Sequence, residues 1–505
     1  MAIEGATVEL VAALGGAAAA AALLGRSKWV VVPGLATLAA AEILLGLSLV
    51  TRADLEPAVS SAPRLAATAL AAAALLAATF AFYRFPAWTP VALLVAAPFR
   101  VPVGFAGDDV LLLLPLYFVL TAAVLAYVVR VLRGAELKPI PFLFAGPAAA
   151  FTLLAAASLS WSTDVHNGTI ELVFFLLPFS ALAAVVARSP FERWTPRALA
   201  TALVSLACAF TAIGLWQLKS GDLFFAPDLE VSNAYTTFFR VTSVFKDPSI
   251  YGRHLALAIV VLVAALWLER IGLLAGSALV AFLWIGLYFS YSQSSMVALG
   301  AGVLAVSLIV ADAQSRRIVL ATTLAFVLLA VPVLLATGKD DSLRRLTSGR
   351  SDLVENAVDV IREHPLVGVG IGAEARESRE LARAKGNRVR KPSHTTPLTV
   401  TAELGVLGML AYLAFLAGGA VMLLRTYRRQ DRALGLALGA AFLVLVVHSL
   451  FYSGFFEDPL MWGTLATAAA ALLAPLGVAA QSPAAAGPTG LGRPAVAGQQ
   501  SKEVF

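Results

Sequence analysis

Apolar runs of about 20 residues recur along nearly the whole chain, and they constrain its fold more than any other feature. A helix needs about 20 residues to cross a bilayer core of roughly 30 Å. Of the 505 residues, 59% are hydrophobic and only 13% are charged, whereas soluble proteins carry about 25% charged residues. The sequence therefore predicts an all-α polytopic integral membrane protein with about 12–15 transmembrane helices and a large, partly helical extracytoplasmic loop before the last three.

Fifteen spans are expected from these runs. They lie at about 7–25, 28–50, 65–83, 88–105, 110–130, 142–161, 168–187, 197–217, 251–268, 272–290, 294–311, 317–336, 396–424, 433–453 and 459–476. The fourth carries Pro98 and Pro102 near its end, and proline removes a backbone donor and distorts a helix. We expect this span to be kinked, broken or re-entrant.

Lysine and arginine gather in every second short loop. These basic loops hold Arg26, Lys28, Arg84, Arg130, Arg133, Lys138, Arg188, Arg193, Arg197, Arg270, Arg316, Arg317, Arg425, Arg428, Arg429 and Arg432. The alternate short loops hold only Arg52, Arg64 and Arg100. Because cytoplasmic loops are enriched in these residues, the pattern predicts an amino terminus outside and a carboxyl terminus in the cytoplasm.

Two connections, 218–250 and 337–395, are too long to be simple links, and the predicted orientation places both outside. Loops longer than about 15 residues are usually functional or disordered. An apolar stripe that includes Ala357 and Ile361 predicts a helix in the second loop. The predicted organisation is N-terminal helices over 1–87, a core over 88–336 with the outer loop 218–250, the large loop 337–395, C-terminal helices over 396–476, and a disordered cytoplasmic tail over 477–505.

His394 is the strongest candidate for acid–base chemistry. It lies just before a long span, at the predicted outer surface. An imidazole with a pKa near 6.5 can accept a proton at neutral pH, which suits activation of a hydroxyl. The alternative is an interfacial histidine without a role. Arg390 and Lys391 precede it and favour the first interpretation, because together they form a cationic patch that could hold an anion.

A second cationic patch is expected in the first outer loop, where Arg240 and Lys246 lie near one another in sequence. Arg253 follows within the first turn of the next span. An arginine at that depth is costly unless it pairs or reaches the interface, so either pairing or snorkelling can explain it.

Metal and nucleotide chemistry receive weaker support. Asp108 and Asp109 precede an apolar run and could hold a divalent metal, but helix capping explains them better. The glycines of PLVGVGIG (365–372) lack a surrounding βαβ unit, so we interpret them as a turn. The single cysteine, Cys208, excludes a disulfide framework and a thiol-based metal site. We expect no metal and no other cofactor.

Five segments, taken in order, resemble the O-antigen ligase and Wzy-type polymerase family of bacterial membrane glycosyltransferases. They are ASLSWSTD (157–164), AIGLWQLKSG (212–221), RVTSVFKDPSIYGRHLALA (240–258), SGRSDLVENAVDVIREHPLVGVGIG (348–372) and SHTTPLTVTAELGVLG (393–408). Two departures stand out. Gln293 occupies the position where the family often has arginine, and Ser249 stands where asparagine is usual. Thr395, in place of asparagine after the histidine, is a smaller deviation.

The resemblance implies glycan transfer from an undecaprenyl diphosphate carrier to an acceptor hydroxyl, at the outer face of the bacterial cytoplasmic membrane. It implies His394 as the base, with Arg240, Arg253, Arg350, Arg390 and Lys391 holding the diphosphate. Gln293 and Glu403 are candidate supporting residues. Glu403 could orient the imidazole only if the intervening chain is not continuous helix.

The partners expected from this resemblance are the lipid-linked glycan, an acceptor glycan or lipid, membrane lipids and candidate polysaccharide-assembly proteins, with no nucleic acid. Ligase and polymerase both remain open. A different class, a polysaccharide or lipid-linked-glycan transporter or flippase that cleaves no bond, is the alternative. A transporter more often shows an internal repeat with paired broken helices, and none is evident here.

Overall fold

The computed structural model describes residues 5–50, 62–105, 108–234, 238–321, 323, 350–384 and 395–475. His394, Arg390, Lys391 and the predicted tail lie outside these ranges. In the described part of the chain, twelve helices are long and apolar enough to cross a membrane. The prediction of an all-α polytopic membrane protein is confirmed.

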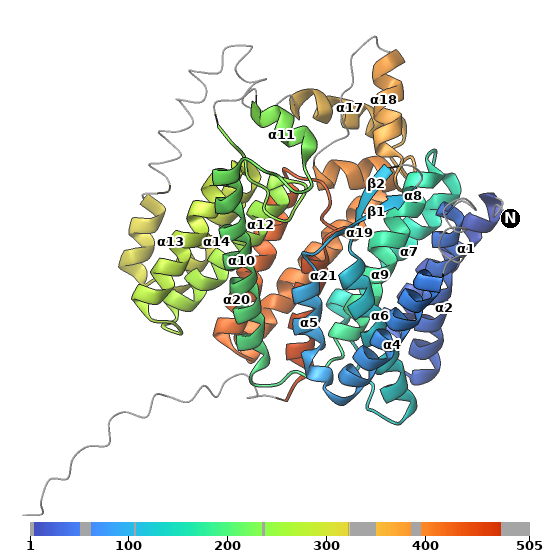
Figure 1. Ribbon diagram of the computed structural model, residues 1–505, viewed down its shortest axis with the longest axis horizontal. Coiled ribbons are helices and arrows are strands. Elements are labelled where there is room, and N and C mark those ends of the chain that lie inside the picture. The colour runs from blue at the N-terminus through green and yellow to red at the C-terminus, as the bar shows by residue number, and fades with distance from the viewer. Residues whose placement is uncertain are drawn as a thin grey trace, which may run out of the picture.

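The elements follow one another as α1 (Gly5–Leu24), α2 (Lys28–Leu49), α4 (Ala62–Arg84), η1 (Pro86–Trp88), α5 (Thr89–Ala96), β1 (Val101–Phe105), β2 (Asp108–Leu112), α6 (Leu114–Leu132), α7 (Phe142–Ser158), η2 (Leu159–Trp161), α8 (Val165–Glu171), η3 (Leu172–Leu176), α9 (Leu177–Val186), α10 (Thr195–Ser220), α11 (Pro227–Ala234), α12 (Pro248–Trp267), α13 (Leu273–Ser290), α14 (Gln293–Val310), α17 (Arg350–Glu363), α18 (Glu374–Ala384), α19 (Thr396–Arg429), α20 (Arg432–Ser449) and α21 (Pro459–Leu473). Most of the long helices run roughly side by side as one bundle, and α11, α17 and α18 cover one of its ends (Figure 1).

Two of the fifteen expected spans differ from continuous membrane-spanning helices, and a third lies mostly outside the described part of the chain. The span at 88–105 is broken as predicted: α5 ends at Ala96, and the chain continues through Pro98 into β1. The last span is a helix of only 15 residues, Pro459–Leu473. Of the span at 317–336, residues 324–336 lie outside the described part.

The capping interpretation of Asp108 and Asp109 is wrong. Both lie in β2, which pairs antiparallel with β1 in a register that sets Phe105 opposite Asp108 and Gly104 opposite Asp109. The following helix begins instead at Leu114, with a proline in its first turn, a position that proline tolerates well. A pair of aspartates before an apolar run resembles a helix start, but pairing with a second segment decided the local structure.

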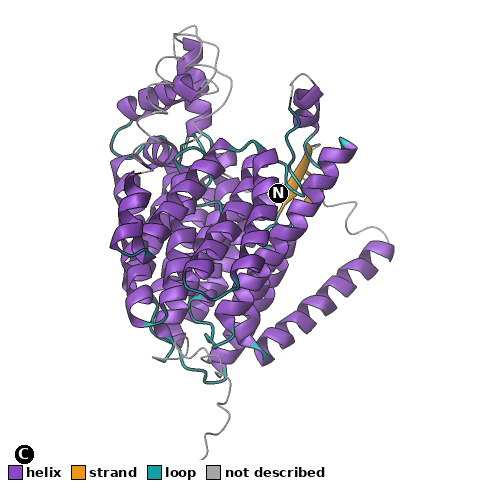
Figure 2. Cartoon of the chain, turned by 90° about the vertical axis from the view of Figure 1, so that its left-hand side faces the viewer, coloured by secondary structure: helices purple, strands orange, loops and turns teal. Residues whose placement is uncertain are grey.

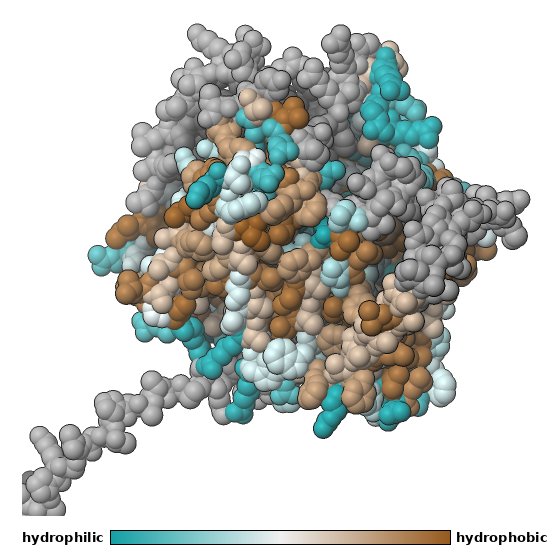
Figure 3. All heavy atoms as spheres, in the orientation of Figure 1, coloured by the Kyte–Doolittle hydropathy of each residue, from teal (hydrophilic) through white to brown (hydrophobic). Residues whose placement is uncertain are grey.

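Other predictions from the sequence hold. The helix predicted in the second long loop is α17; Ala357 of its predicted apolar stripe is fully buried, and so is Val360, which lies outside that stripe. The glycine-rich stretch 365–372 is a turn, with Gly368, Gly370 and Gly372 at positive φ. Helices make up nearly all of the described chain, and the long ones also run roughly side by side when the molecule is turned by 90° (Figure 2). On the face shown in Figure 3, hydrophobic residues form a broad middle zone while hydrophilic residues gather toward the two ends. This distribution suits a protein that lies across a bilayer.

Candidate functional site

The glycine turn at 365–372 is held by the end of α7 and the segment that follows it. The Ser158 hydroxyl accepts a hydrogen bond from the Ile371 amide at 3.0 Å, and the Ser162 hydroxyl donates to the Ile371 carbonyl at 2.8 Å. The Thr163 amide donates to the Val369 carbonyl at 3.2 Å. Two of the five motif segments, far apart in sequence, are thus joined through the backbone of the turn.

Gly370 shows why this turn needs glycine. Its φ is +90°, and a Cβ placed there would overlap the backbone of Ser162. Only glycine combines this backbone conformation with so close an approach. The Gly370 amide also donates to the Glu403 carbonyl at 2.8 Å, which brings a third motif segment, the start of α19, to the same turn.

Glu403 lies where α19 is interrupted. Gly405, two residues later, has φ 62° and ψ −158°, so two helical pieces meet at a kink. The Glu403 side chain is buried, and its carboxylate accepts hydrogen bonds from the backbone amides of Gly372 and Glu374. Its observed contacts therefore stabilise the glycine turn and the start of α18. Between position 394 and Glu403 the chain is helical from Thr396 onward, and the kink at Gly405 comes only after Glu403. The break in the helix that would let this carboxylate orient the imidazole is therefore absent from residues 396–403.

The other two motif segments meet around Gln217. Its side-chain amide donates to the Ser243 carbonyl at 2.9 Å, and its oxygen accepts from the Ser243 amide at 2.6 Å. Arg240 is half-buried, and its Nε donates to the Ser290 carbonyl at 3.3 Å. Burial lowers the pKa of the Arg240 guanidinium, and Asp247 raises it. The 240–258 segment is thus fastened to the ends of α10 and α13.

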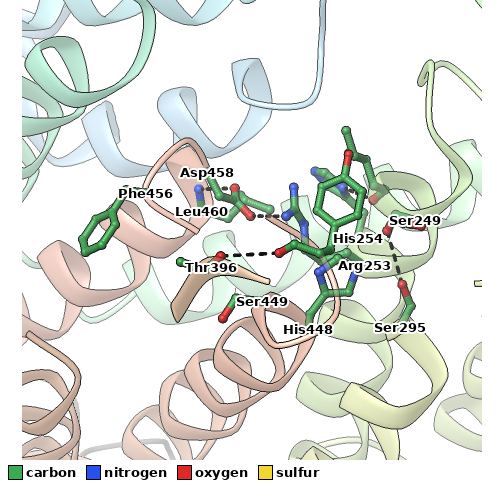
Figure 4. Close-up of polar contacts among 12 residues, drawn as sticks. Ser249, Arg253, His254, Ser295, Thr396, His448, Ser449, Phe456, Asp458 and Leu460 are labelled. Atoms are coloured by element: carbon green, nitrogen blue, oxygen red, sulfur yellow. Dashed lines mark hydrogen bonds and ion pairs between the residues drawn. The ribbon is translucent and has the colours of Figure 1, made fainter. Parts of the chain in front are cut away.

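Arg253 does not snorkel to the surface. Its guanidinium pairs with the Asp458 carboxylate at 3.1 Å, and both side chains are buried (Figure 4). Asp458 also caps α21 by accepting from the Leu460 amide at 2.9 Å. Of the two explanations for an arginine at this depth, pairing is the one that applies.

The loop between α20 and α21, residues 450–458, connects the parts of this region. The Tyr452 hydroxyl donates to the Asp247 carboxylate at 3.1 Å, and the Tyr452 carbonyl accepts from Thr396 at 3.5 Å (Figure 4). His448, at the end of α20, lies 3.3 Å from the Ser294 hydroxyl. The starts of α12 and α19 therefore contact this loop, and the start of α14 contacts the end of α20 just before it.

A small cavity opens beside the buried ion pair. Its polar lining consists of Arg100, Arg253, His254, Glu457 and Asp458. Burial lowers the pKa of the Arg100 guanidinium. Burial raises the pKa of the Glu457 carboxyl, while Arg100 and Arg253 lower it. The cavity thus joins two cations and two acids at the end of the bundle from which α12 and α21 start.

A second cavity, almost entirely apolar, adjoins the first. It lies among α5, α9, α10, α12, α20 and α21, and Ala97, Pro459 and Leu460 line both cavities. Its wall carries residues such as Leu93, Leu203 and Leu257. An elongated molecule with one charged end and an apolar chain matches the chemistry of the two cavities together.

Not all predicted site residues gather here. Arg253 lines the polar cavity, whereas Arg240 and Glu403 bind neighbouring segments. Gln293 is exposed at the start of α14. Arg350 begins α17, and its side chain is outside the described part of the structure, as are His394, Arg390 and Lys391. Among the described residues, no group of three metal-ligating side chains comes together.

Sequence reasoning missed Arg100, Tyr452, Glu457 and Asp458. Arg100 was noted only as a loop charge. The sequence does contain a pattern that points to Glu457 and Asp458. Glu457-Asp458-Pro459 precedes an apolar run just as Lys246-Asp247-Pro248 does, and charged residues that border a span often have a function.

Comparison with known proteins finds a match for one part of the chain. No curated protein matches the chain. Residues 278–413 match the family model described as O-Antigen ligase, and this stretch contains most of α13, all of α14, α17 and α18, and the kinked start of α19. The match supports the resemblance found in the motifs: residues 278–413 are similar to the O-antigen ligase family, in a chain whose described part holds twelve helices that could cross a membrane.

Proposed function

We propose that the protein transfers a glycan from an undecaprenyl diphosphate carrier to an acceptor hydroxyl, at the outer face of the bacterial cytoplasmic membrane. The observation that carries this proposal is the junction of the two cavities. A cavity lined by Arg253 and further charged groups adjoins an apolar cavity within the helix bundle. A lipid diphosphate needs both environments, and the match to the O-antigen ligase family supports the same reaction class.

The residue types suit diphosphate departure without a metal. Fixed guanidinium groups can stabilise the negative charge that grows on the leaving diphosphate. Arg253 and Arg240 are the described candidates, and Arg350, Arg390 and Lys391 would add charge from the large loop. Attack by the acceptor oxygen opposite the leaving diphosphate inverts the anomeric carbon. His394 would accept the proton of that hydroxyl.

The orientation required by this chemistry places α17 and α18 outside, above the ends of the helices that border the polar cavity. The domain division follows: N-terminal helices over 1–87, a core over 88–336, the outer loop 337–395, C-terminal helices over 396–476 and a cytoplasmic tail. The glycine turn would then position the large loop over the site through Glu403 and Ser162.

The test uses purified full-length protein, a synthetic polyprenyl-diphosphate glycan and EDTA. Release of lipid diphosphate with a ladder of longer glycans would identify a polymerase. A single transfer to a foreign acceptor would identify a ligase. Movement of the glycolipid across a vesicle membrane without bond cleavage would contradict the proposal and favour a flippase. Loss of activity in EDTA that magnesium restores would contradict the metal-free mechanism.

A further inference from the structure

Arg100 is the charged residue of the polar cavity that has no assigned task. It follows the break after α5 and precedes β1, and it is half-buried. Within the described parts of the chain, its guanidinium forms neither a hydrogen bond nor an ion pair. Lining the same cavity as Arg253, it offers five N–H donors in a planar fork to a ligand.

The other charges of the cavity make Arg100 the cation available to an anion. Arg253 is already paired with Asp458 at 3.1 Å. Burial raises the pKa of Glu457, the remaining acid, while Arg100 and Arg253 lower it. His254 is held by the Ile250 carbonyl at 2.8 Å from its Nδ1. Because Arg253 is paired with Asp458, Arg100 is the cation of this cavity that bonds no described residue and is open to a ligand.

Arg100 also lies at the junction with the apolar cavity. Ala97, three residues before it, lines both cavities. Pro98 stands between them, where the helical path has ended. A charged group held by Arg100 would therefore have its apolar chain directed among α5, α10, α12 and α21, whose side chains form the apolar wall.

We propose that Arg100 binds the diphosphate group of the lipid carrier, together with Arg253, at the junction of the two cavities. The inference rests on the proposed function for the identity of the carrier, but the binding step can be measured without transfer. The guanidinium donates paired N–H bonds to phosphate oxygens, a geometry that a lysine ammonium cannot reproduce.

The experiment measures binding to the full-length protein in lipid nanodiscs. The probes are a prenyl diphosphate, the prenyl alcohol of the same chain length and inorganic diphosphate. The variants are Arg100→Gln, Arg100→Lys and the control Arg84→Gln, which removes an exposed arginine at the end of α4. Melting curves establish that each variant is folded.

Arg100→Gln should weaken prenyl diphosphate binding by about 10- to 100-fold, the range expected for charge-assisted hydrogen bonds. Prenyl alcohol binding should stay unchanged, Arg100→Lys should be intermediate, and Arg84→Gln should match wild type. Prenyl diphosphate binding by folded Arg100→Gln within about twofold of wild type would overturn the inference. If the wild-type protein bound inorganic diphosphate and prenyl diphosphate with equal affinity, the inference that the apolar cavity holds the prenyl chain would be overturned.

Failure of the proposed function gives a different result. Wild-type protein that binds prenyl diphosphate through Arg100 but transfers no glycan would contradict the transferase and leave the Arg100 site standing. Wild-type protein that transfers glycan, with unchanged binding and transfer in Arg100→Gln, would contradict only the role of Arg100.

Discussion

Arg253, near the start of α12, and Asp458, at the start of α21, form an ion pair 3.1 Å long whose side chains are only 8% and 3% exposed. Two charges so far from water are tolerated because each offsets the other. The pair fastens two helices that border both cavities, so it holds one wall of the proposed carrier site in place.

Asp458→Asn removes the charge but keeps an oxygen that can cap α21. We expect it to destabilise the protein by about 3–5 kcal/mol, because the buried Arg253 is left without its counter-ion. The measurement is thermal unfolding of purified protein. Arg253→Met combined with Asp458→Asn should recover much of the loss. A double variant as unstable as Asp458→Asn would contradict the pairing argument, and a stable one that still transfers glycan would exclude Arg253 from catalysis.

Gly370→Ala should disrupt the glycine turn. The positive φ alone costs a non-glycine residue about 1–3 kcal/mol, and the added Cβ would overlap the Ser162 backbone. We expect weaker transfer and greater protease sensitivity around α17 and α18. Gly300→Ala is the control, because a Cβ there meets open space. Equal behaviour of the two variants would show that the turn tolerates a side chain.

Binding of the carrier should depend on pH through Glu457. The pKa of this carboxyl is already raised by burial, and a diphosphate nearby would raise it further, so binding takes up a proton. Affinity for prenyl diphosphate should therefore be highest below the pKa of the free protein and fall as pH rises toward the pKa of the complex. Glu457→Gln should flatten the profile, leaving only titration of the ligand. An unchanged profile in that variant would exclude Glu457 from the site.

Both long loops should face outside. Ser220 and Glu380 are exposed, so cysteines placed there, in a Cys208→Ala background, should react with an impermeant thiol reagent in intact cells. Arg428→Cys, at a basic end of α19, should react only after lysis. Ser378, in the same helix as Glu380, would be a poor labelling site because its side chain is buried. The opposite pattern would reverse the orientation and contradict the proposed mechanism.

Substitutions at His394 and at Arg240 should have different effects on turnover and carrier binding. Loss of a general base typically lowers the rate by about 10²–10⁴-fold, so His394→Ala should slow turnover while carrier binding persists. Arg240→Ala should weaken both, since a diphosphate is charged before and during bond cleavage, and Arg240→Lys should restore only part. Single-turnover kinetics with measured carrier affinity separates the two effects. Near wild-type turnover in folded His394→Ala would make this histidine structural.

The membrane architecture was predictable because its cause is local. Most of the apolar runs are long enough to span by themselves, and the break at Pro98 follows from proline chemistry. The turn at 365–372 and the helix that became α17 were also predictable from glycine content and an amphipathic stripe. Asp108 and Asp109 were assigned wrongly because a strand depends on a partner segment, and here that partner is β1.

The candidate site was decided by the tertiary structure, because its contacts join residues far apart in the chain. Asp247 and Tyr452 are separated by 205 positions, and no local pattern indicates that they meet. By sequence alone, Arg253 could pair or snorkel, and Arg100 was one more loop charge. Burial in a low-dielectric bundle makes each such charge depend on its neighbours. Helix packing determines those neighbours. It places Asp458 next to Arg253, and it places Arg100 in a cavity wall where no described residue forms an ion pair with it.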